Sequence, residues 1–286
     1  MRCNWKISKH TDFEQPLIKY RRYLQEHGLR ESTIVGYEGN LLRYLKFCEN
    51  DQPSVEDWER FRDTLFGRKL KRCTLNQYAY AAKAYHEMVG KPIIIHRLEP
   101  NNQIPYFFTE EDIEKIFSVI SNIKHLAMLQ TLFYACLRAS ELCNLNDEDL
   151  DLKGLTIRIR EGKGGRDGLA YITSKCANTL RQYLTIRPPV LIDKERPLFF
   201  TDYGQRWNRT ALYRMFAVYK EKAGIEKKGG LHVFSRHSSA SILAKNGCDL
   251  RSIQALLRHQ DINTTLRYTH LSDATKREKY EQYLTL

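Results

Sequence analysis

The chain has 286 residues, of which 42% are hydrophobic and 28% are charged, a composition typical of a globular protein rather than a disordered one. Lys and Arg number 46 against 34 Asp and Glu, and the net charge of +12 favours a polyanionic partner such as nucleic acid. The longest mostly apolar run, at 125–137, is too short to cross a bilayer, and the N-terminus lacks the apolar core of a secretory signal.

The seven cysteines bear on the cellular compartment. They are scattered along the chain, odd in number and never spaced Cys-x-x-Cys. Because a secreted disulfide framework uses an even number of cysteines at regular spacings, this pattern predicts reduced thiols and a cytoplasmic location.

Residues 1–91 are predicted to form a small all-helical domain. The first helix, with a proline in its first turn, ends before Gly28. A second helix, at 32–49, carries apolar residues at helical spacing. Ser54 starts the Ser-x-x-Asp pattern of a capping box for the third helix, and an Ala- and Tyr-rich fourth helix stops at Gly90. No strand pattern competes with these helices.

Residues 92–105 are the predicted linker, because they hold three of the eight prolines and a pair of asparagines. Residues 106–286 then mix helices with two β-rich runs around a Gly-rich turn at 155–173, which predicts a hairpin. The predicted fold class is mainly α with a small β-sheet: a helical N-terminal domain and an α+β C-terminal domain. Helices are predicted in the second domain at 110–121, 124–136, 139–145, 175–186, 208–223, 236–246, 250–258, 262–269 and 273–284.

Two basic residues of the second domain stand at positions where they could contact a phosphate. Arg138 follows an apolar helix in "FYACLRASELCNL", and taken alone it is best interpreted as a surface arginine paired with Glu141. Lys163 lies at the predicted hairpin tip, in "EGKGGRD". Most turn lysines are simply solvated, but a lysine at a tip can also reach a bound phosphodiester.

Two further stretches carry histidines, an arginine and a tyrosine. The stretch "LHVFSRHSSASIL" places His232, Arg236 and His237 where a helix begins, and free N–H groups at such a position favour an anion. The stretch "LLRHQDINTTLRYTH" supplies His259 and, nine residues later, Tyr268. Each of these signals is weak by itself, since histidines at helix starts and half-buried tyrosines are common in ordinary packing.

Together, in this order, the four stretches resemble the motifs of the tyrosine recombinase (phage integrase) family, and the resemblance covers essentially the whole chain. "LRASEL" resembles the first arginine box, "GKGGRD" the hairpin lysine box, "SRHSSA" the second arginine box, and "LLRHQDINTTLRYTH" the last box with its nucleophile. Glu141 takes a supporting role in this resemblance. The catalytic residues that it implies are Arg138, Lys163, His232, Arg236, His259 and Tyr268.

The chain departs from the family pattern at three positions. His232 stands four residues before Arg236 instead of three, as though Ser235 were inserted. Either a local bulge returns this histidine to the phosphate, or its contact is lost. Cys136 and Arg258 occupy places where the family usually has glycine.

The resemblance implies a minimal, Xer-like site-specific recombinase that cleaves and rejoins double-stranded DNA through a 3′-phosphotyrosine link. The two arginines would bind the scissile phosphate, Lys163 would protonate the leaving 5′-oxygen, and the histidines would bind the phosphate or manage the tyrosine proton. No metal, ATP or other cofactor is expected, since the chain has no G-x-x-x-x-G-K-[ST] loop and its acidic run "NDEDLD" lacks the spacing of an EF-hand.

Assembly and competing functions stay open at this point. The family implies a specific target site and a tetrameric synapse on DNA. The last helix could dock on a neighbouring copy or pack on its own domain. A type IB topoisomerase shares the tyrosine chemistry, and a DNA-binding homologue that has lost catalysis is the alternative from a different functional class.

Overall fold

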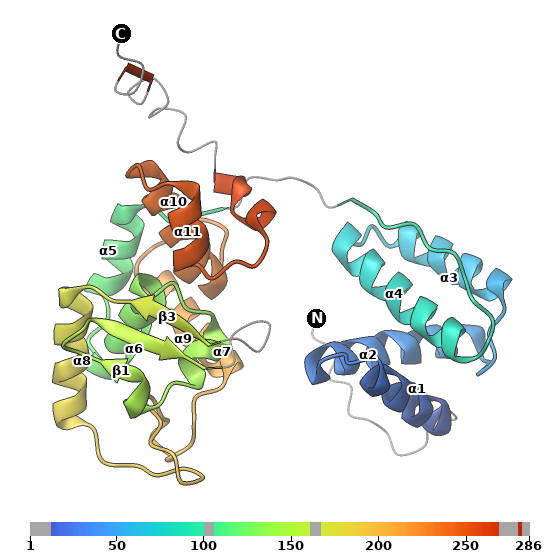
Figure 1. The fold of residues 1–286 in the computed structure, drawn as a ribbon, viewed down its shortest axis with the longest axis horizontal. Coiled ribbons are helices and arrows are strands. Elements are labelled where there is room, and N and C mark those ends of the chain that lie inside the picture. The colour runs from blue at the N-terminus through green and yellow to red at the C-terminus, as the bar shows by residue number, and fades with distance from the viewer. Residues whose placement is uncertain (1–12, 100–105, 161–166, 269–279, 282–286) are drawn as a thin grey trace. The chain divides into compact units, whose positions relative to one another are not determined.

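The computed structural model describes residues 13–99, 106–160, 167–268 and 280–281 (Figure 1). The chain divides into two compact units, Met1–Asn102 and Gln103–Leu286. Lys163 and nearly all of the predicted helix at 273–284 lie outside the described residues. Within the described part of the chain, every helix is too short or too polar to cross a membrane.

In its described residues, 13–99, the first unit contains four helices, α1 (Glu14–Glu26), α2 (Glu31–Cys48), α3 (Val55–Gly67) and α4 (Arg72–Met88). The chain leaves α1 through Gly28, whose φ of +70° lies in the left-handed region that favours glycine. At α3 the predicted capping box is present. The Asp57 N–H donates to Ser54 Oγ at 3.2 Å, and the Ser54 N–H donates to Asp57 Oδ2 at 2.8 Å.

Aromatic side chains from all four helices form the core of the first unit. Tyr20, Tyr44 and Tyr85 are almost completely buried there. Each hydroxyl is hydrogen-bonded; that of Tyr44 bonds to His86 Nε2 at 2.8 Å. Most tyrosines of this unit therefore serve packing.

The second unit has a three-stranded antiparallel sheet in the order β1-β2-β3, formed by Leu150–Asp151, Thr156–Ile159 and Gly168–Tyr171. The predicted hairpin is thus present as β2 and β3. Ile157 and Ile159 of β2 point into the core, and α6 packs against α8 beside them. The helices are α5 (Glu110–Ser118), α6 (Ile123–Tyr134), α7 (Ala139–Cys143), α8 (Ser174–Ile186), α9 (Arg209–Lys222), α10 (Ser239–Lys245) and α11 (Leu250–Leu256).

Two predicted helices differ from the structure. The one at 236–246 begins earlier, as a π-helix over Val233–Ser238 that continues directly into α10. The one predicted at 262–269 is instead made of short 3₁₀ turns, beginning with Ile262–Thr264. Asp261 caps this segment by accepting the Asn263 N–H, and the consecutive threonines that follow are poor helix formers, so an α-helix does not propagate.

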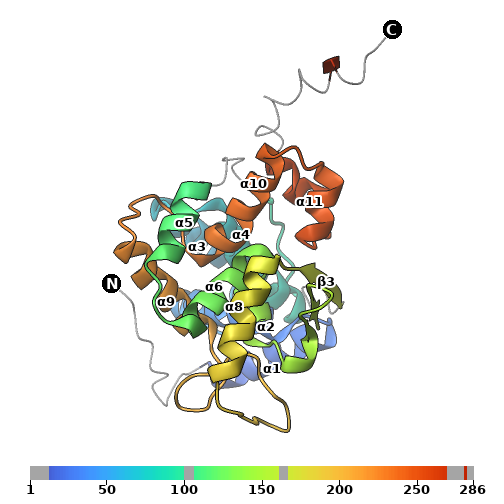
Figure 2. The same cartoon turned by 90° about the vertical axis from the view of Figure 1, so that its left-hand side faces the viewer.

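In both views α10 and α11 lie at the end of the second unit opposite the loop that follows α8 (Figures 1 and 2). The π-helix, α11 and the 3₁₀ turns therefore meet the turn between α6 and α7 at one end of the unit. The π-helix, the turn before α7, the residues just after α11 and the 3₁₀ turns each carry a residue that the sequence singled out.

Candidate active site

Arg138 is the residue immediately before α7 and is fixed there by Glu141. Its backbone N–H donates to Glu141 Oε2 at 2.8 Å, and its guanidinium donates to Glu141 Oε1 at 2.6 Å. Glu141 is only 7% exposed, whereas the Arg138 side chain keeps 21% of its surface open. The predicted pairing of Arg138 with Glu141 is therefore present, but the carboxylate of Glu141 is buried.

The turn before Arg138 runs through Cys136, which has a φ of +49°. A residue with a Cβ costs about 1–2 kcal/mol in this left-handed conformation. The conformation lets the Cys136 carbonyl oxygen accept from Arg236 at 2.7 Å and from Arg258 at 3.2 Å. The position where the family usually has glycine thus keeps a glycine-like backbone, and its carbonyl joins two arginines.

Arg236 lies on the π-helix and is only 2% exposed. Two of its five N–H donors are used by the carbonyl oxygens of Cys136 and Leu257. Burial, followed by the charges of Arg138 and Arg258, lowers the pKa of Arg236 to about 10. The guanidinium consequently stays protonated at neutral pH, held rigidly by the backbone of two other segments.

The π-helix supplies a bulge, which was one of the two alternatives left open by the four-residue spacing between His232 and Arg236. A π-turn contains one residue more than an α-turn, so it takes up an inserted residue without ending the helix. Ser238 Oγ donates to the Val233 carbonyl at 2.9 Å, which stabilises this turn. His232 is an exposed residue, but its ring is partly covered by the surrounding protein; this burial, followed by the charges of Arg236 and Arg138, lowers the pKa of His232.

His259 follows α11 after Arg258, whose φ is +53°. Its Nδ1 bonds to the buried Thr265 Oγ1 at 2.9 Å, which orients the ring and leaves Nε2 as the nitrogen for another partner. Burial and the charges of Arg236 and Arg138 lower the pKa of His259 to about 3. The imidazole is therefore neutral at physiological pH.

Tyr268 lies on the 3₁₀ turns and is only 2% exposed. Its ring packs in an apolar cluster with Ala240, Ile253 and Leu257, among others. Burial raises the pKa of its hydroxyl to about 12, although the charges of Arg236 and Arg267 oppose the rise. The hydroxyl bonds to His237 Nδ1 at 2.5 Å.

Arg258 adds a third guanidinium to the group. It donates to Glu141 Oε2 at 2.9 Å and to the carbonyl oxygens of Ala135 and Cys136. Burial alone would raise the pKa of Glu141, but Arg258 and Arg138 hold it below its usual value. Two arginines, Arg138 and Arg258, thus pair with one ionised carboxylate, and Arg236 adds a third positive charge nearby, which leaves positive charge in excess for an anion.

Five of the six predicted site residues lie close enough that their charges act on one another: Arg138, His232, Arg236, His259 and Tyr268. Lys163 lies outside the described residues, between β2 and β3. The first residue of β3, Gly168, approaches the cluster, since a Cβ there would stand 2.8 Å from Arg258 Cδ.

Sequence reasoning gave no role to three residues that the structure places here: His237, Arg258 and Thr265. His237 directly follows Arg236, and this adjacency was the available signal. Arg258 was noted only as a replacement for glycine. Thr265 had no signal, because its bond to His259 depends on how the chain turns between them.

The carboxylates of the acidic run at 147–151 have partners outside this group of residues. Arg187 pairs with Asp147, and Arg160 pairs with two further carboxylates of the run. The last carboxylate accepts two backbone N–H groups of the turn that follows. Among the residues that the structure describes, no group of three or more potential metal ligands is gathered.

Comparison with known proteins gives consistent results for the sequence. A model of the phage integrase family matches residues 106–275. The chain is 35% identical to tyrosine recombinase XerC of Thermodesulfovibrio yellowstonii over 268 residues, which cover 86% of this chain and 88% of that protein. It is 30% identical to tyrosine recombinase XerA of Pyrococcus horikoshii over 272 residues, which cover 93% of this chain and 92% of that protein.

Solved structures resemble the chain over nearly its full length. The crystal structure of XerA recombinase is 28% identical, with a TM-score of 0.56 over 95% of this chain and 99% of the other. XerH site-specific recombinase bound to difH substrate is 18% identical, with a TM-score of 0.73 over 95% of this chain and 96% of the other. The Tn1549 transposon integrase in complex with circular intermediate DNA is 20% identical, with a TM-score of 0.74 over 93% and 99%. The last two likenesses establish the fold.

Proposed function

The chain belongs to the phage integrase family and is a tyrosine recombinase, and on this premise we propose that Tyr268 is its nucleophile. Tyr268 attacks a phosphorus of double-stranded DNA, forms a 3′-phosphotyrosine and releases a 5′-hydroxyl. The observation that carries this assignment is the position of its hydroxyl, bonded to His237 in a group that also contains Arg138, Arg236 and His259.

Arg138 and Arg236 are proposed to bind the scissile phosphate. Phosphoryl transfer spreads negative charge over the oxygens between the attacking and leaving groups, and guanidiniums can bind two such oxygens at once. Both arginines are preorganised, one by Glu141 and the other by two backbone carbonyls. Removing one preorganised donor from a site of this kind costs about 3–4 kcal/mol of transition-state stabilisation.

His232, His259 and Lys163 complete the proposed site. His232, an exposed residue, and Nε2 of His259 would donate to phosphate oxygens. Lys163 would protonate the leaving 5′-oxygen, and the approach of Gly168 to Arg258 supports a hairpin that reaches the phosphate. Because the covalent link conserves the energy of the broken bond, the reaction proceeds without ATP, and the guanidiniums take the place of a metal.

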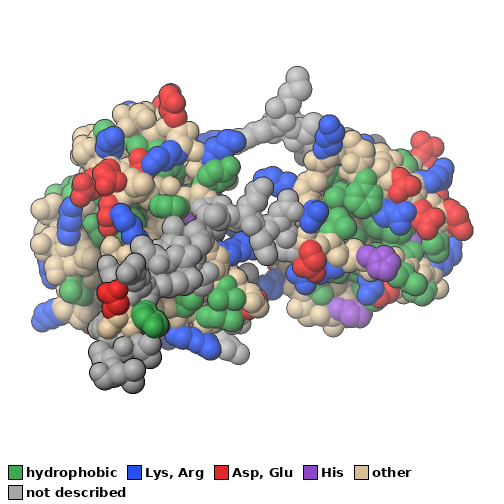
Figure 3. All heavy atoms as spheres, turned by 90° about the horizontal axis from the view of Figure 1, so that it is seen from above, with side chains coloured by type: hydrophobic (Ala, Val, Ile, Leu, Met, Phe, Trp, Pro, Cys, Tyr) green, Lys and Arg blue, Asp and Glu red, His purple; other side chains and the backbone are tan. Residues whose placement is uncertain are grey.

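Both units are proposed to contact DNA. Residues 1–91 would form a core-binding domain and residues 106–286 the catalytic domain, with 92–105 as the linker that lets both contact a specific target site in the cytoplasm. On the face in Figure 3, Lys and Arg side chains are spread over both units and interspersed with Asp and Glu. Such a distribution suits contacts with phosphates from more than one surface.

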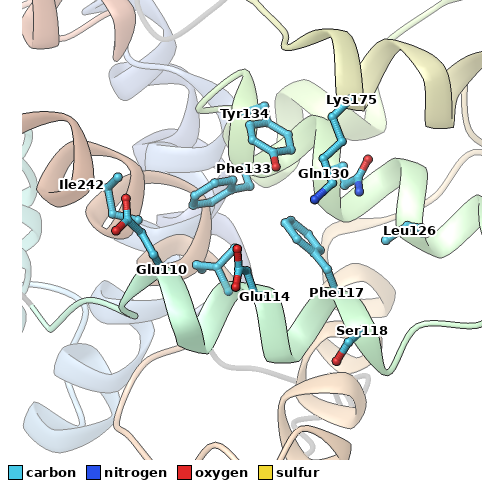
Figure 4. Close-up of a pocket in the computed structure, with 11 residues that line it drawn as sticks. Glu110, Glu114, Phe117, Ser118, Leu126, Gln130, Phe133, Tyr134, Lys175 and Ile242 are labelled. Carbon is cyan, nitrogen blue, oxygen red and sulfur yellow. The ribbon is translucent and has the colours of Figure 1, made fainter. Parts of the chain in front are cut away.

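A tetrameric synapse is proposed for the assembled state. A groove of about 570 Å³ between α5, α6, α8 and α10 has apolar walls, which include Phe117 and Phe133 (Figure 4). Gln130 lines it, and its buried Oε1 has no hydrogen-bond partner among the described residues. We expect the C-terminal residues of a neighbouring copy to occupy this groove. Leu126→Lys should then weaken pairing of two duplexes, measured by sedimentation, without reducing cleavage of one duplex.

The nucleophile is tested with a nicked duplex that carries the target site and traps the covalent intermediate. Wild-type protein should form a protein–DNA adduct, and Tyr268→Phe should form none. Tyr213→Phe, which changes an exposed tyrosine of α9, is the matched control and should react like wild type. An adduct from Tyr268→Phe would disprove the assignment. Relaxation of plasmids without a target site would instead indicate a topoisomerase.

A further inference from the structure

The hydroxyl of the proposed nucleophile has a partner to which none of the recognised motifs assigns a role. His237 Nδ1 lies 2.5 Å from Tyr268 Oη, and the two ring centroids are 6.0 Å apart. Since Tyr268 is only 2% exposed, its hydroxyl is largely withdrawn from solvent and depends on this contact. The hydrogen bond therefore determines where the phenol proton can go.

The π-helix explains why His237 reaches this position. Residues five apart are one hydrogen-bonded turn apart in a π-helix, so residue 237 follows residue 232 along the same side. The rings of His232 and His237 are accordingly 5.0 Å apart and nearly perpendicular, at 88°. The π-turn thus keeps the two histidines side by side despite the inserted residue; one belongs to an exposed residue and the other contacts the tyrosine.

The surroundings keep His237 neutral. Burial lowers the pKa of His237 to about 4, with further lowering from His232, from Arg236 on its own element, and from Arg267 on the 3₁₀ turns. Tyr268, with a pKa raised to about 12 by burial, keeps its proton in the resting protein. A bound phosphodiester would add a negative charge beside these cations and make an imidazolium more stable.

We propose that His237 is the general base of the cleavage step, with its resting proton on Nε2 and the lone pair of Nδ1 facing the Tyr268 hydroxyl. This proposal rests on the proposed role of Tyr268 as nucleophile. As the bond between Tyr268 Oη and phosphorus forms, the phenol proton passes to His237 Nδ1. The bond between phosphorus and the 5′-oxygen breaks, and that oxygen takes its proton from a separate acid, for which Lys163 is the candidate. Rejoining reverses each transfer.

The pH dependence of single-turnover cleavage tests this role. His237→Asn places an amide near the position of Nδ1 and keeps a hydrogen bond, but it cannot take a proton, and His237→Ala removes both. General base catalysis contributes about 10²–10⁴-fold, so both variants should cleave slower by that factor at pH 7. Their rates should rise about tenfold per pH unit, as phenolate becomes the reactant, while the wild-type rate stays nearly level.

A second substrate separates the base from the acid. In DNA with sulfur in place of the bridging 5′-oxygen, the leaving thiolate needs no proton, so Lys163→Ala should regain most of its rate on this substrate. Both His237 variants should stay slow. If the sulfur-containing DNA restores the cleavage rate of His237→Asn, then His237 acts on the leaving group, and the proposal is overturned.

Three further results decide the matter. DNA affinity and melting temperature should match wild type, which shows that the variants fold. A wild-type rate in His237→Asn together with a loss in His237→Ala would show that the histidine only positions the tyrosine, contrary to the proposal. If wild-type protein forms no adduct through Tyr268, the proposed function fails, and this outcome is distinct from a failure of His237.

Discussion

Arg258 donates to Glu141 Oε2 at 2.9 Å, while the other oxygen of the same carboxylate accepts from Arg138. Through this shared carboxylate, Arg258, which follows α11, is connected to Arg138, the proposed phosphate-binding arginine before α7. Arg258 also donates to the Cys136 carbonyl, to which Arg236 is bonded. It therefore contacts the supports of both arginines in the proposed clamp.

Arg258→Gly is expected to leave the stability of the protein nearly unchanged but to slow DNA cleavage. Glycine removes about 1–2 kcal/mol of strain at the positive φ, and this gain offsets the lost hydrogen bonds. We expect a free energy of unfolding within about 1 kcal/mol of wild type but roughly tenfold slower cleavage, because Arg138 loses part of its support. Urea unfolding and single-turnover cleavage would measure the two effects. A wild-type cleavage rate would show that Arg258 is only structural.

The histidines of the site predict how stability changes with pH. The folded-state pKa of His237 is about 4 and that of His259 about 3, both below the value of about 6.5 in an unfolded chain. At pH values between the folded-state and the unfolded-state pKa of each histidine, the unfolded chain binds more protons than the folded one. The free energy of unfolding should therefore be at its full value above pH 6.5 and fall as the pH is lowered towards 4. Urea titrations at several pH values should show this slope, and His237→Asn should make it shallower. An equal slope in the variant would contradict the prediction.

His232→Ala tests whether the π-helix returns the exposed histidine to the phosphate. We expect cleavage about 100-fold slower, the loss typical of one donor to a developing charge, with DNA affinity nearly unchanged. Single-turnover rates and binding isotherms at one salt concentration would measure both quantities. If the rate does not change, the shifted histidine takes no part in the reaction.

Ser54→Ala probes the first unit independently of the catalytic site. The substitution removes the side-chain acceptor of the capping box at α3 and should lower the stability of this unit by about 1 kcal/mol. Ser32→Ala, at an exposed position near the start of α2, is the matched control and should have little effect. Thermal melts of the two variants should differ; equal melting temperatures would mean that the cap contributes nothing.

Local signals in the sequence were sufficient for much of this structure. The capping box at Ser54, the end of α1 at Gly28 and the hairpin depend on residues a few positions apart, and all three are present. The motifs also named Arg138 and Arg236, whose guanidiniums reach a common environment.

The contacts that the sequence did not predict join residues that are far apart along the chain. The bond from His237 to Tyr268 spans 31 positions, and that from Arg258 to Glu141 spans 117. The helix predicted at 262–269 was wrong in type, because Thr264 and Thr265 are poor α-helix formers and the described residues 262–268 form 3₁₀ turns instead. The bulge at His232 was one of two open alternatives, since a single inserted residue does not reveal whether a helix absorbs it.

The burial of Tyr268 has a consequence for chemical durability. Nitrating or iodinating reagents reach tyrosines through solvent, and Tyr203, which is 91% exposed, stands open to them. The side chain of Tyr268, the proposed nucleophile, is instead shielded by an apolar cluster, and its hydroxyl is bonded to the imidazole of His237. In protein that is not bound to DNA, exposed tyrosines such as Tyr203 can therefore be modified while Tyr268, the proposed nucleophile, stays unmodified.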